Sequence, residues 1–259
     1  GAEESRSVFV NGKSDGNTRG DYFTTVMLGH IPALLSGRIE NAAVIGFGTG
    51  ITIGTLAQYS ELKKIDVLEI ADTIVNNAFR FDAYNGAVSK HPKVEFHVMD
   101  AFRYFEGTRS TFDIIVSEPS NPWVMGIENL YSKEFYHLAK NQLSEAGTFT
   151  QWVHSYSFND DLFRMVIKTM RGEFPYVSVF QLKGGDLALI GRTQPFPSNF
   201  SKTLLNRMRE SGPEATLAAA GITRPEAVLA LEIVPHSLVE QMSFGGAEHH
   251  LTEPRLSTE

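Results

Sequence analysis

The sequence contains no cysteine among its 259 residues, which excludes disulfide bonds and thiolate metal sites. No run approaches the roughly 18 apolar residues that a membrane-spanning helix needs, so we expect no membrane segment in this chain. Basic residues are few, 23 against 30 acidic ones for a net charge of −7, and they form no cluster. A surface that follows nucleic-acid phosphates needs such a cluster, so we expect a small or cationic partner and no nucleic acid.

The start of the chain also lacks a signal peptide, because residues 1–5 (GAEES) have neither a basic nor an apolar region. We therefore expect a cytoplasmic location. The cytosolic domain of a membrane-anchored protein is the alternative, since either end of the sequence can be a cut edge. The length suits one large domain with a small appendage, and a homodimer is compatible with the composition.

A short β element and a helix come first. Residues 8–13 predict a strand that enters an Asn11-Gly12 turn, because such a pair adopts the positive φ of tight hairpins. Between Tyr22 and Leu35, apolar residues recur at helical spacing, and Gly37 follows as a stop. We assign residues 1–20 to the remnant of an N-terminal β-hairpin domain.

Strands then alternate with helices as far as residue 195. The predicted strands are 42–45, 65–70, 94–99, 112–116, 148–153, 176–182 and 187–190, and helices are predicted at 71–84, 133–143 and 159–174. This order implies an α/β fold with a seven-stranded, mostly parallel sheet that is covered on both faces and ends in an antiparallel edge hairpin. Short helical pieces at 202–210, 214–220 and 225–231 predict a helical C-terminal appendage, 196–259, beside a main domain of residues 21–195.

A glycine-rich loop, Gly46-Phe47-Gly48-Thr49-Gly50, follows the first of these strands and opens a helix. The missing side chains let a ligand approach the backbone, and the helix start offers free N–H groups. Glu69 ends the next strand about twenty residues on, where an acid accepts hydrogen bonds from ribose hydroxyls. Together they predict a nucleoside site, and a tight turn beside a surface glutamate is the simpler alternative.

Asp100 and Ala101 follow the third strand at the same edge of the sheet. The acid is placed to bind the exocyclic amine of adenine, or alternatively to cap the next helix. The dinucleotide fingerprint G-x-G-x-x-G would need glycine at position 51, where this chain has Ile51. We therefore favour a sulfonium cofactor of the S-adenosylmethionine type over a dinucleotide.

Two further motifs, FDIIVSEPSNP at 112–122 and LYSKEFY at 130–136, resemble the spermidine synthase (polyamine aminopropyltransferase) family. More closely, the chain is similar to the spermidine synthase-like domains that bacteria often fuse to membrane segments. The resemblance covers about Val8 to Arg192. It implies a class I methyltransferase-like (Rossmann-like) fold and, without a metal, a decarboxylated S-adenosylmethionine or S-adenosylmethionine cofactor. The implied reaction is transfer of an aminopropyl group to an amine in polyamine biosynthesis.

The resemblance also implies roles for individual residues. It makes Glu69 the ribose-binding acid and Asp100, beside Ala101, the adenine-binding acid. Glu118 falls on the family's catalytic Asp in the pattern D-[ST]-[ST]-D-P, and Asn121 falls on the second Asp. At the end of the fourth strand, Glu118 is placed to act as a general base or as an anchor for an amine, with a capping role as the alternative.

Four positions depart from the family pattern. Asp15 stands on the nucleoside-contacting Gln, Thr24 and Thr25 stand on the Tyr-His pair of the active site, and Thr49 stands on the Asp of the G-G-G-D-G loop. An Asp there pairs with the amine of decarboxylated S-adenosylmethionine and repels the carboxylate of S-adenosylmethionine by roughly several kcal/mol in a poorly solvated site. We expect Thr49 to remove that discrimination, so both donors stay candidates.

The acceptor pocket is expected where the fifth strand ends. Gln151, Trp152, His154 and Tyr156 lie there, and core packing is the alternative for these side chains. Trp123, in Asn-Pro-Trp, resembles the polar-Pro-aromatic motifs with which amino-directed methyltransferases hold a nitrogen nucleophile.

Three functions remain open on these grounds. They are an aminopropyltransferase, a methyltransferase of a small molecule, and a non-catalytic nucleoside-binding sensor or assembly domain. His249 and His250 have neither a zinc spacing nor an i, i+4 relation, so we assign no metal. His30 lies in a helical apolar stripe and is interpreted as a packed side chain.

Overall fold

The structure is a computed structural model that describes residues 5–10, 12–120, 126–154, 159–196, 206–207, 210–242, 244–253 and 255–256. It opens with an antiparallel hairpin of β1 (Ser7–Val10) and β2 (Lys13–Asn17). Gly12 has a φ of +81°, which glycine adopts without strain. The predicted N-terminal β element is therefore confirmed.

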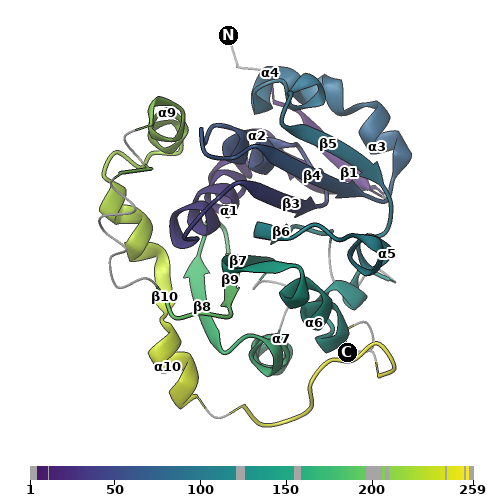
Figure 1. Cartoon of the computed structure of the whole chain (residues 1–259), viewed down its shortest axis with the longest axis vertical. Helices are drawn as coiled ribbons and strands as arrows, with labels where there is room; N and C mark the ends of the chain where they lie inside the picture. Colours follow the sequence, from purple (N-terminus) through teal and green to yellow (C-terminus); the bar gives the residue numbers. More distant parts are fainter. Residues whose placement is uncertain are drawn as a thin grey trace.

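A twisted sheet of eight strands forms the centre of the molecule, in the order β10-β8-β9-β7-β6-β3-β4-β5 (Figure 1). The strands are β3 (Asn41–Ile45), β4 (Lys64–Glu69), β5 (Val94–Val98), β6 (Phe112–Ser117), β7 (Leu143–His154), β8 (Tyr176–Gln181), β9 (Asp186–Arg192) and β10 (Glu232–Val234). β3 to β7 pair in parallel, and β8 and β9 form the predicted antiparallel hairpin. The expected count of seven strands is wrong, because β10 from the C-terminal segment pairs with β8 and covers its open edge.

Helices cover both faces of the sheet, as the strand and helix alternation predicted (Figure 1). One face carries α1 (Tyr22–Leu35) and α2 (Ile51–Ala57), and the other carries α5 (Ala101–Gly107), α6 (Lys133–Asn141) and α7 (Asp160–Glu173). Successive residues of β3 divide between the two cores, with Ala42 and Val44 in the first and Ala43 and Ile45 in the second.

The helix predicted at 71–84 is broken into shorter pieces. These are α3 (Asp72–Asn76), η1 (Ala78–Phe81) and α4 (Asp82–Asn85), and a further 3-10 turn, η2 (Val88–Lys90), follows them. The side-chain amide of Asn77 donates to the Thr73 carbonyl at 2.9 Å, while its backbone N–H turns to Ile74 at 3.1 Å. The Asn side chain thus takes the carbonyl that an uninterrupted helix would give to the backbone, which ends the helix there.

The C-terminal segment contains α9 (Ser211–Ala219), η5 (Pro225–Leu231) and α10 (His236–Gln241). Figure 1 shows it running from α9 past β8 and on toward α6 and α7. Leu217 and Val228 join the first core, and Val239 and Leu256 join the second. The helix expected at 202–210 falls mostly outside the described residues.

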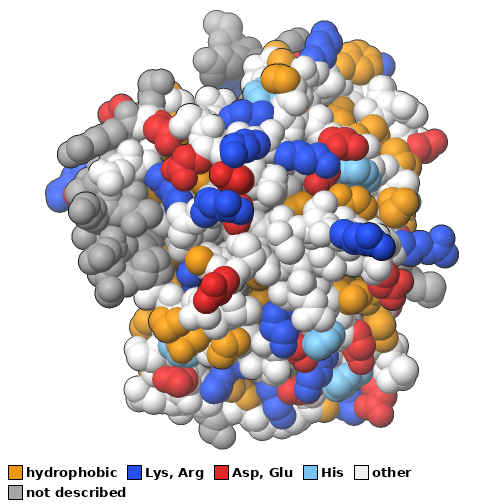
Figure 2. Space-filling view, in the orientation of Figure 1, with side chains coloured by type: hydrophobic (Ala, Val, Ile, Leu, Met, Phe, Trp, Pro, Cys, Tyr) orange, Lys and Arg blue, Asp and Glu red, His pale blue; other side chains and the backbone are white. Residues whose placement is uncertain are grey.

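The surface in Figure 2 intersperses basic and acidic side chains and shows no large area of one charge. Within the described ranges, no helix has the length and apolar character required to cross a membrane. His30 is fully buried in α1, where its imidazole bonds to Tyr59 at 2.7 Å and to Thr216 at 2.9 Å. Its interpretation as a packed side chain is confirmed.

Candidate functional site

Two cavities meet at the carboxyl edge of the parallel strands. Cavity A, about 390 Å³, lies beyond the ends of β3, β4 and β6. β3 has β4 on one side and β6 on the other, so the chain order reverses at this point of the sheet. Ligands bind at such reversals in open α/β sheets. Eight residues predicted from the sequence line cavity A: Asp15, Gly46, Gly48, Glu69, Asp100, Ala101, Glu118 and Trp152.

The glycine loop leaves room for a ligand against its backbone. Gly46 has a φ of +89°, and a Cβ there would lie 2.4 Å from the carbonyl oxygen of Glu118. Gly48, with a φ of +51°, would direct a Cβ into open space. Glycine at 46 is therefore required because the Glu118 carbonyl, just after β6, approaches it closely. Glycine at 48 leaves the space above the loop free of a side chain.

Glu69 is held at the bottom of cavity A with only 7% of its surface exposed. Its Oε2 accepts a hydrogen bond from the Phe47 N–H at 3.0 Å, and its Oε1 accepts one from the Ala71 N–H at 2.9 Å. Each carboxylate oxygen can accept a second hydrogen bond. The side chain is thus fixed in place and keeps the capacity to bind a pair of hydroxyls.

The far end of cavity A combines an acid with apolar side chains. Asp100 caps α5, because its Oδ1 accepts from the Arg103 N–H at 3.2 Å, so the capping interpretation is confirmed while Asp100 still lines the cavity. Ile70 and Met99 line the same end and are 68% and 45% exposed. Large apolar side chains left open beside an acid suit a flat, polar-edged ring such as adenine.

Cavity B, about 320 Å³, adjoins cavity A. Its lining includes Thr24 and Thr25 from α1, His154 from β7, Asp21, Lys183 and Asp186. Asp15, Glu118 and Trp152 line both cavities. These three side chains therefore lie at the junction of the two cavities.

Glu118 follows β6, and its backbone N–H donates to the Ile45 carbonyl at 2.9 Å. Its Oε2 accepts a hydrogen bond from the Thr52 hydroxyl at 2.6 Å. Burial raises the pKa of Glu118 to about 8, the Thr52 hydrogen bond opposes this rise, and the negative charges of Asp15 and Asp186 add to it. The carboxyl group therefore titrates in the range where a general base is most useful.

Some predicted site residues lie elsewhere. Thr49 is 2% exposed, its hydroxyl has no partner among the described residues, and it lines neither cavity. Gly50 and Gln151 do not line them either, and the Gln151 amide donates to the Trp152 carbonyl at 3.3 Å. Asn121, Trp123 and Tyr156 lie outside the described residues.

Asp186 is a site residue that the sequence analysis missed. It lies at the start of β9, directly after the Gly184-Gly185 turn, and was covered only by the prediction of an edge hairpin. Its Oδ2 accepts a hydrogen bond from the Thr24 hydroxyl at 2.8 Å, across 162 residues of sequence. No local spacing can reveal such a pair.

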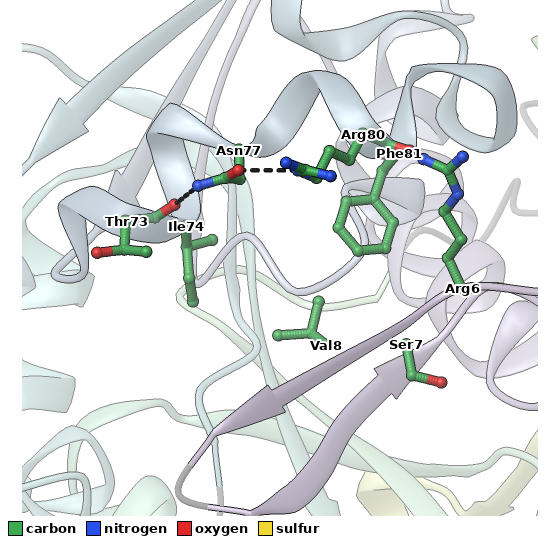
Figure 3. A pocket seen from close by; sticks show the side chains of 8 residues that line it. All are labelled: Arg6, Ser7, Val8, Thr73, Ile74, Asn77, Arg80 and Phe81. Carbon is green, nitrogen blue, oxygen red and sulfur yellow. Dashed lines mark hydrogen bonds between the residues drawn. The ribbon is translucent and has the colours of Figure 1, made fainter.

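A third space, groove C, has a volume of about 420 Å³ and lies between β1 and the α3–η1 segment. Figure 3 shows Val8 opposite Ile74 and Phe81, with Arg6 at the end of the groove near Phe81. Val8 and Ile74 also line cavity A. The described lining of groove C contains none of the predicted site residues and no acid, so we place the chemistry in cavities A and B.

One cluster of possible metal ligands, Asp66, Glu95 and His97, occurs at the β4–β5 side of the sheet. The Lys64 ammonium lies 2.9 Å from Asp66 and 2.8 Å from Glu95. Because this cation already pairs with both acids, we interpret the cluster as an ion-pair network.

Comparison with known proteins identifies the kind of domain. The family model described as "Spermine/spermidine synthase domain" matches residues 22–183. A polyamine aminopropyltransferase of Alkaliphilus oremlandii is 27% identical over 157 residues, which are 60% of this chain and 55% of that protein. One from Clostridium botulinum strain Eklund 17B is 30% identical over 121 residues, 47% of this chain and 42% of that protein. The chain thus spans about half the length of the curated relatives it matches.

Solved structures show the same fold. Spermidine synthase from Thermotoga maritima superposes with a TM-score of 0.74 at 16% identity, over 90% of this chain and 80% of that one. Human methyltransferase-like protein 13, in complex with SAH, gives 0.56 at 19% identity, over 76% of this chain and 90% of that one. The predicted α/β, class I methyltransferase-like fold is confirmed, apart from the additional strand.

Proposed function

Because the chain belongs to the spermine/spermidine synthase family, we propose that it transfers an aminopropyl group from decarboxylated S-adenosylmethionine to a small-molecule amine. The charge of the two cavities carries this proposal. Cavity A is lined by Asp15, Glu69, Asp100 and Glu118, and by no lysine or arginine among the described residues. Cavity B adds Asp21 and Asp186, and Lys183 is the one lysine or arginine among its described lining residues. Both spaces therefore favour cations.

The residues of cavity A fit an adenosine with a cationic tail. Glu69 would bind the ribose hydroxyls, Asp100 and Ala101 would meet the adenine edge, and Gly46 and Gly48 would let the ligand lie against the loop. The tail would extend toward Asp15 and Glu118, which line cavity B as well. When bound, the donor supplies a carbon that its positively charged sulfur has activated.

The same charges favour the decarboxylated donor. A carboxylate on the tail would face the charge of Asp15, and that of Glu118 when it is ionised, without a lysine or arginine among the described lining residues. Residues 121–125, which come next in the sequence, contain no charged residue. Like charges a few ångströms apart in a poorly solvated site repel by roughly several kcal/mol. Thr49 does not line cavity A, so its neutral hydroxyl leaves this preference in place.

The acceptor amine would lie in cavity B and attack through the junction of the two cavities. The new bond joins the amine nitrogen to the carbon on sulfur, the bond from that carbon to sulfur breaks, and the sulfur leaves as a neutral thioether. Glu118 accepts the proton that the nitrogen loses. Positioning and proton removal are then the main tasks of the protein. We assign positioning and proton removal to the main domain, residues 21–195, with residues 1–20 and 196–259 as flanking elements. We propose that the reaction takes place in the cytoplasm.

Calorimetric titration tests the donor, and mass spectrometry of products tests the transfer. Binding of decarboxylated S-adenosylmethionine at least tenfold tighter than S-adenosylmethionine, with aminopropylated product from a panel of amines, would support the proposal. A methylated product from S-adenosylmethionine would replace it with a methyltransferase. Binding of both donors and of methylthioadenosine with equal affinity, without any product, would replace it with a nucleoside-binding domain.

A further inference from the structure

Trp152 occupies an unusual place between the two cavities. It is the one aromatic residue among the three described side chains that line both, and the other two, Asp15 and Glu118, are acids. The bond from sulfur to carbon must break at this junction if the proposed reaction occurs. The indole therefore lies where a donor carries its positive charge before transfer and where the thioether product carries none.

A chain of contacts from three elements holds this indole in place. The Thr24 hydroxyl of α1 donates to Asp186 Oδ2 at 2.8 Å, and Asp186 Oδ1 lies 3.0 Å from His154 Nδ1. The His154 ring packs edge-to-face against the Trp152 ring, with 4.0 Å between centroids and 66° between planes. Thr24, His154 and Asp186 are all buried, Asp186 at 8% exposure. Such a buried, hydrogen-bonded chain leaves the indole little freedom to reorient.

We propose that Trp152 makes the site selective for a cationic sulfur, and that Asp186 is a positioning residue that fixes the indole through His154. An aromatic ring attracts a cation through its quadrupole, and indole does so most strongly among the side chains. The attraction grows where water is excluded, and the Thr24–Asp186–His154 chain beside the indole is buried. A neutral thioether gains none of it, so the contact favours the donor and assists release of the product.

The inference rests on the proposed sulfonium donor, and a matched ligand pair tests it directly. The pair is decarboxylated S-adenosylmethionine and its analogue without the S-methyl group, which is a neutral thioether of almost the same shape. We expect Trp152→Leu to weaken binding of the sulfonium by about 10- to 30-fold and binding of the thioether by less than about threefold. Trp152→Phe keeps an aromatic ring and should retain most of the preference. An equal loss for both ligands in Trp152→Leu would overturn the inference.

A double-mutant cycle tests the positioning role of Asp186. Asp186→Asn should lower the sulfonium preference in the wild-type background and leave it unchanged in the Trp152→Leu background, because its effect passes through the indole. Equal effects in the two backgrounds would show that Asp186 acts by its own charge and would refute positioning. The near-ultraviolet circular dichroism of Trp152 should change in Asp186→Asn and stay constant in Glu106→Gln, which removes an exposed charge on α5.

The two proposals fail in distinguishable ways. A protein that forms no aminopropylated product but loses its sulfonium preference in Trp152→Leu would disprove the proposed reaction and support the role of Trp152. A protein that forms the product but shows the same ligand preference in Trp152→Leu as in the wild type would support the proposed reaction and disprove the role of Trp152. Thermal unfolding of each variant, compared with Trp152→Phe, shows whether a loss of binding reflects loss of the fold.

Discussion

Replacing Glu118 with glutamine should stop turnover and leave donor binding intact. Gln can still accept the Thr52 hydrogen bond, now 2.6 Å long, but it cannot take up the proton of the acceptor amine. Loss of a general base lowers kcat by about 10²- to 10⁴-fold. Calorimetry should give a dissociation constant for decarboxylated S-adenosylmethionine within about threefold of the wild type.

The wild-type pH profile follows from the same side chain. With a pKa of about 8, Glu118 is roughly one-tenth ionised at pH 7 and nine-tenths ionised at pH 9, so kcat/KM should rise about tenfold between them. Initial rates at a fixed, subsaturating acceptor concentration measure this rise. A flat profile from pH 6 to 9, or a Glu118→Gln variant with normal turnover, would refute the assignment of Glu118 as the base.

Stability should change in the opposite direction from activity. The folded state raises the pKa of Glu118 above its unfolded value, so the folded protein is destabilised as pH rises from the unfolded pKa of about 4.5 through the folded pKa of about 8. Glu118→Gln removes this penalty. Thermal unfolding at pH 8 should therefore give a higher Tm for the variant than for the wild type, and the difference should vanish near pH 4. A lower Tm at pH 8 would contradict the burial of the charge.

Four further substitutions probe Glu69 and the glycine loop. Glu69→Ala should abolish measurable nucleoside binding by calorimetry, since it removes the only buried carboxylate held between the glycine loop and Ala71; retained binding would show that the ribose lies elsewhere. Gly46→Ala should lower the free energy of unfolding in urea more than Gly48→Ala does. Both substitutions cost about 1 kcal/mol because both positions have a positive φ, but only the new Cβ at position 46 meets a carbonyl oxygen, at 2.4 Å. Equal losses would contradict this close approach. Thr49→Val should leave the affinity for the donor unchanged. It should raise the free energy of unfolding by about 1 kcal/mol, because it removes a buried hydroxyl without a partner among the described residues. A tenfold loss of affinity would show that Thr49 contacts the donor.

Local patterns predicted the elements that carry the nucleoside half of the site. The helical spacing from Tyr22 to Leu35 gave the bounds of α1, and the glycine loop and Glu69 were placed at the ends of β3 and β4. Glu118 was placed at the end of β6 in the same way. Parallel strands end at one edge of a sheet, so acids and glycines at successive strand ends converge there without knowledge of any long-range contact. That is why the acids and glycines at these strand ends, which line cavity A, were predictable.

Only the tertiary structure decided the rest. β10 has three residues, too few for an alternation to show, and exists because β8 offers it an open edge. Asp186 meets Thr24 across 162 residues, and Thr49 turns away from the cavity although it lies inside the glycine loop. The pKa of Glu118 depends on burial and on acids that three other segments supply. Strand-end positions are fixed by local periodicity, whereas side-chain partners, burial and charge depend on which distant segments pack together.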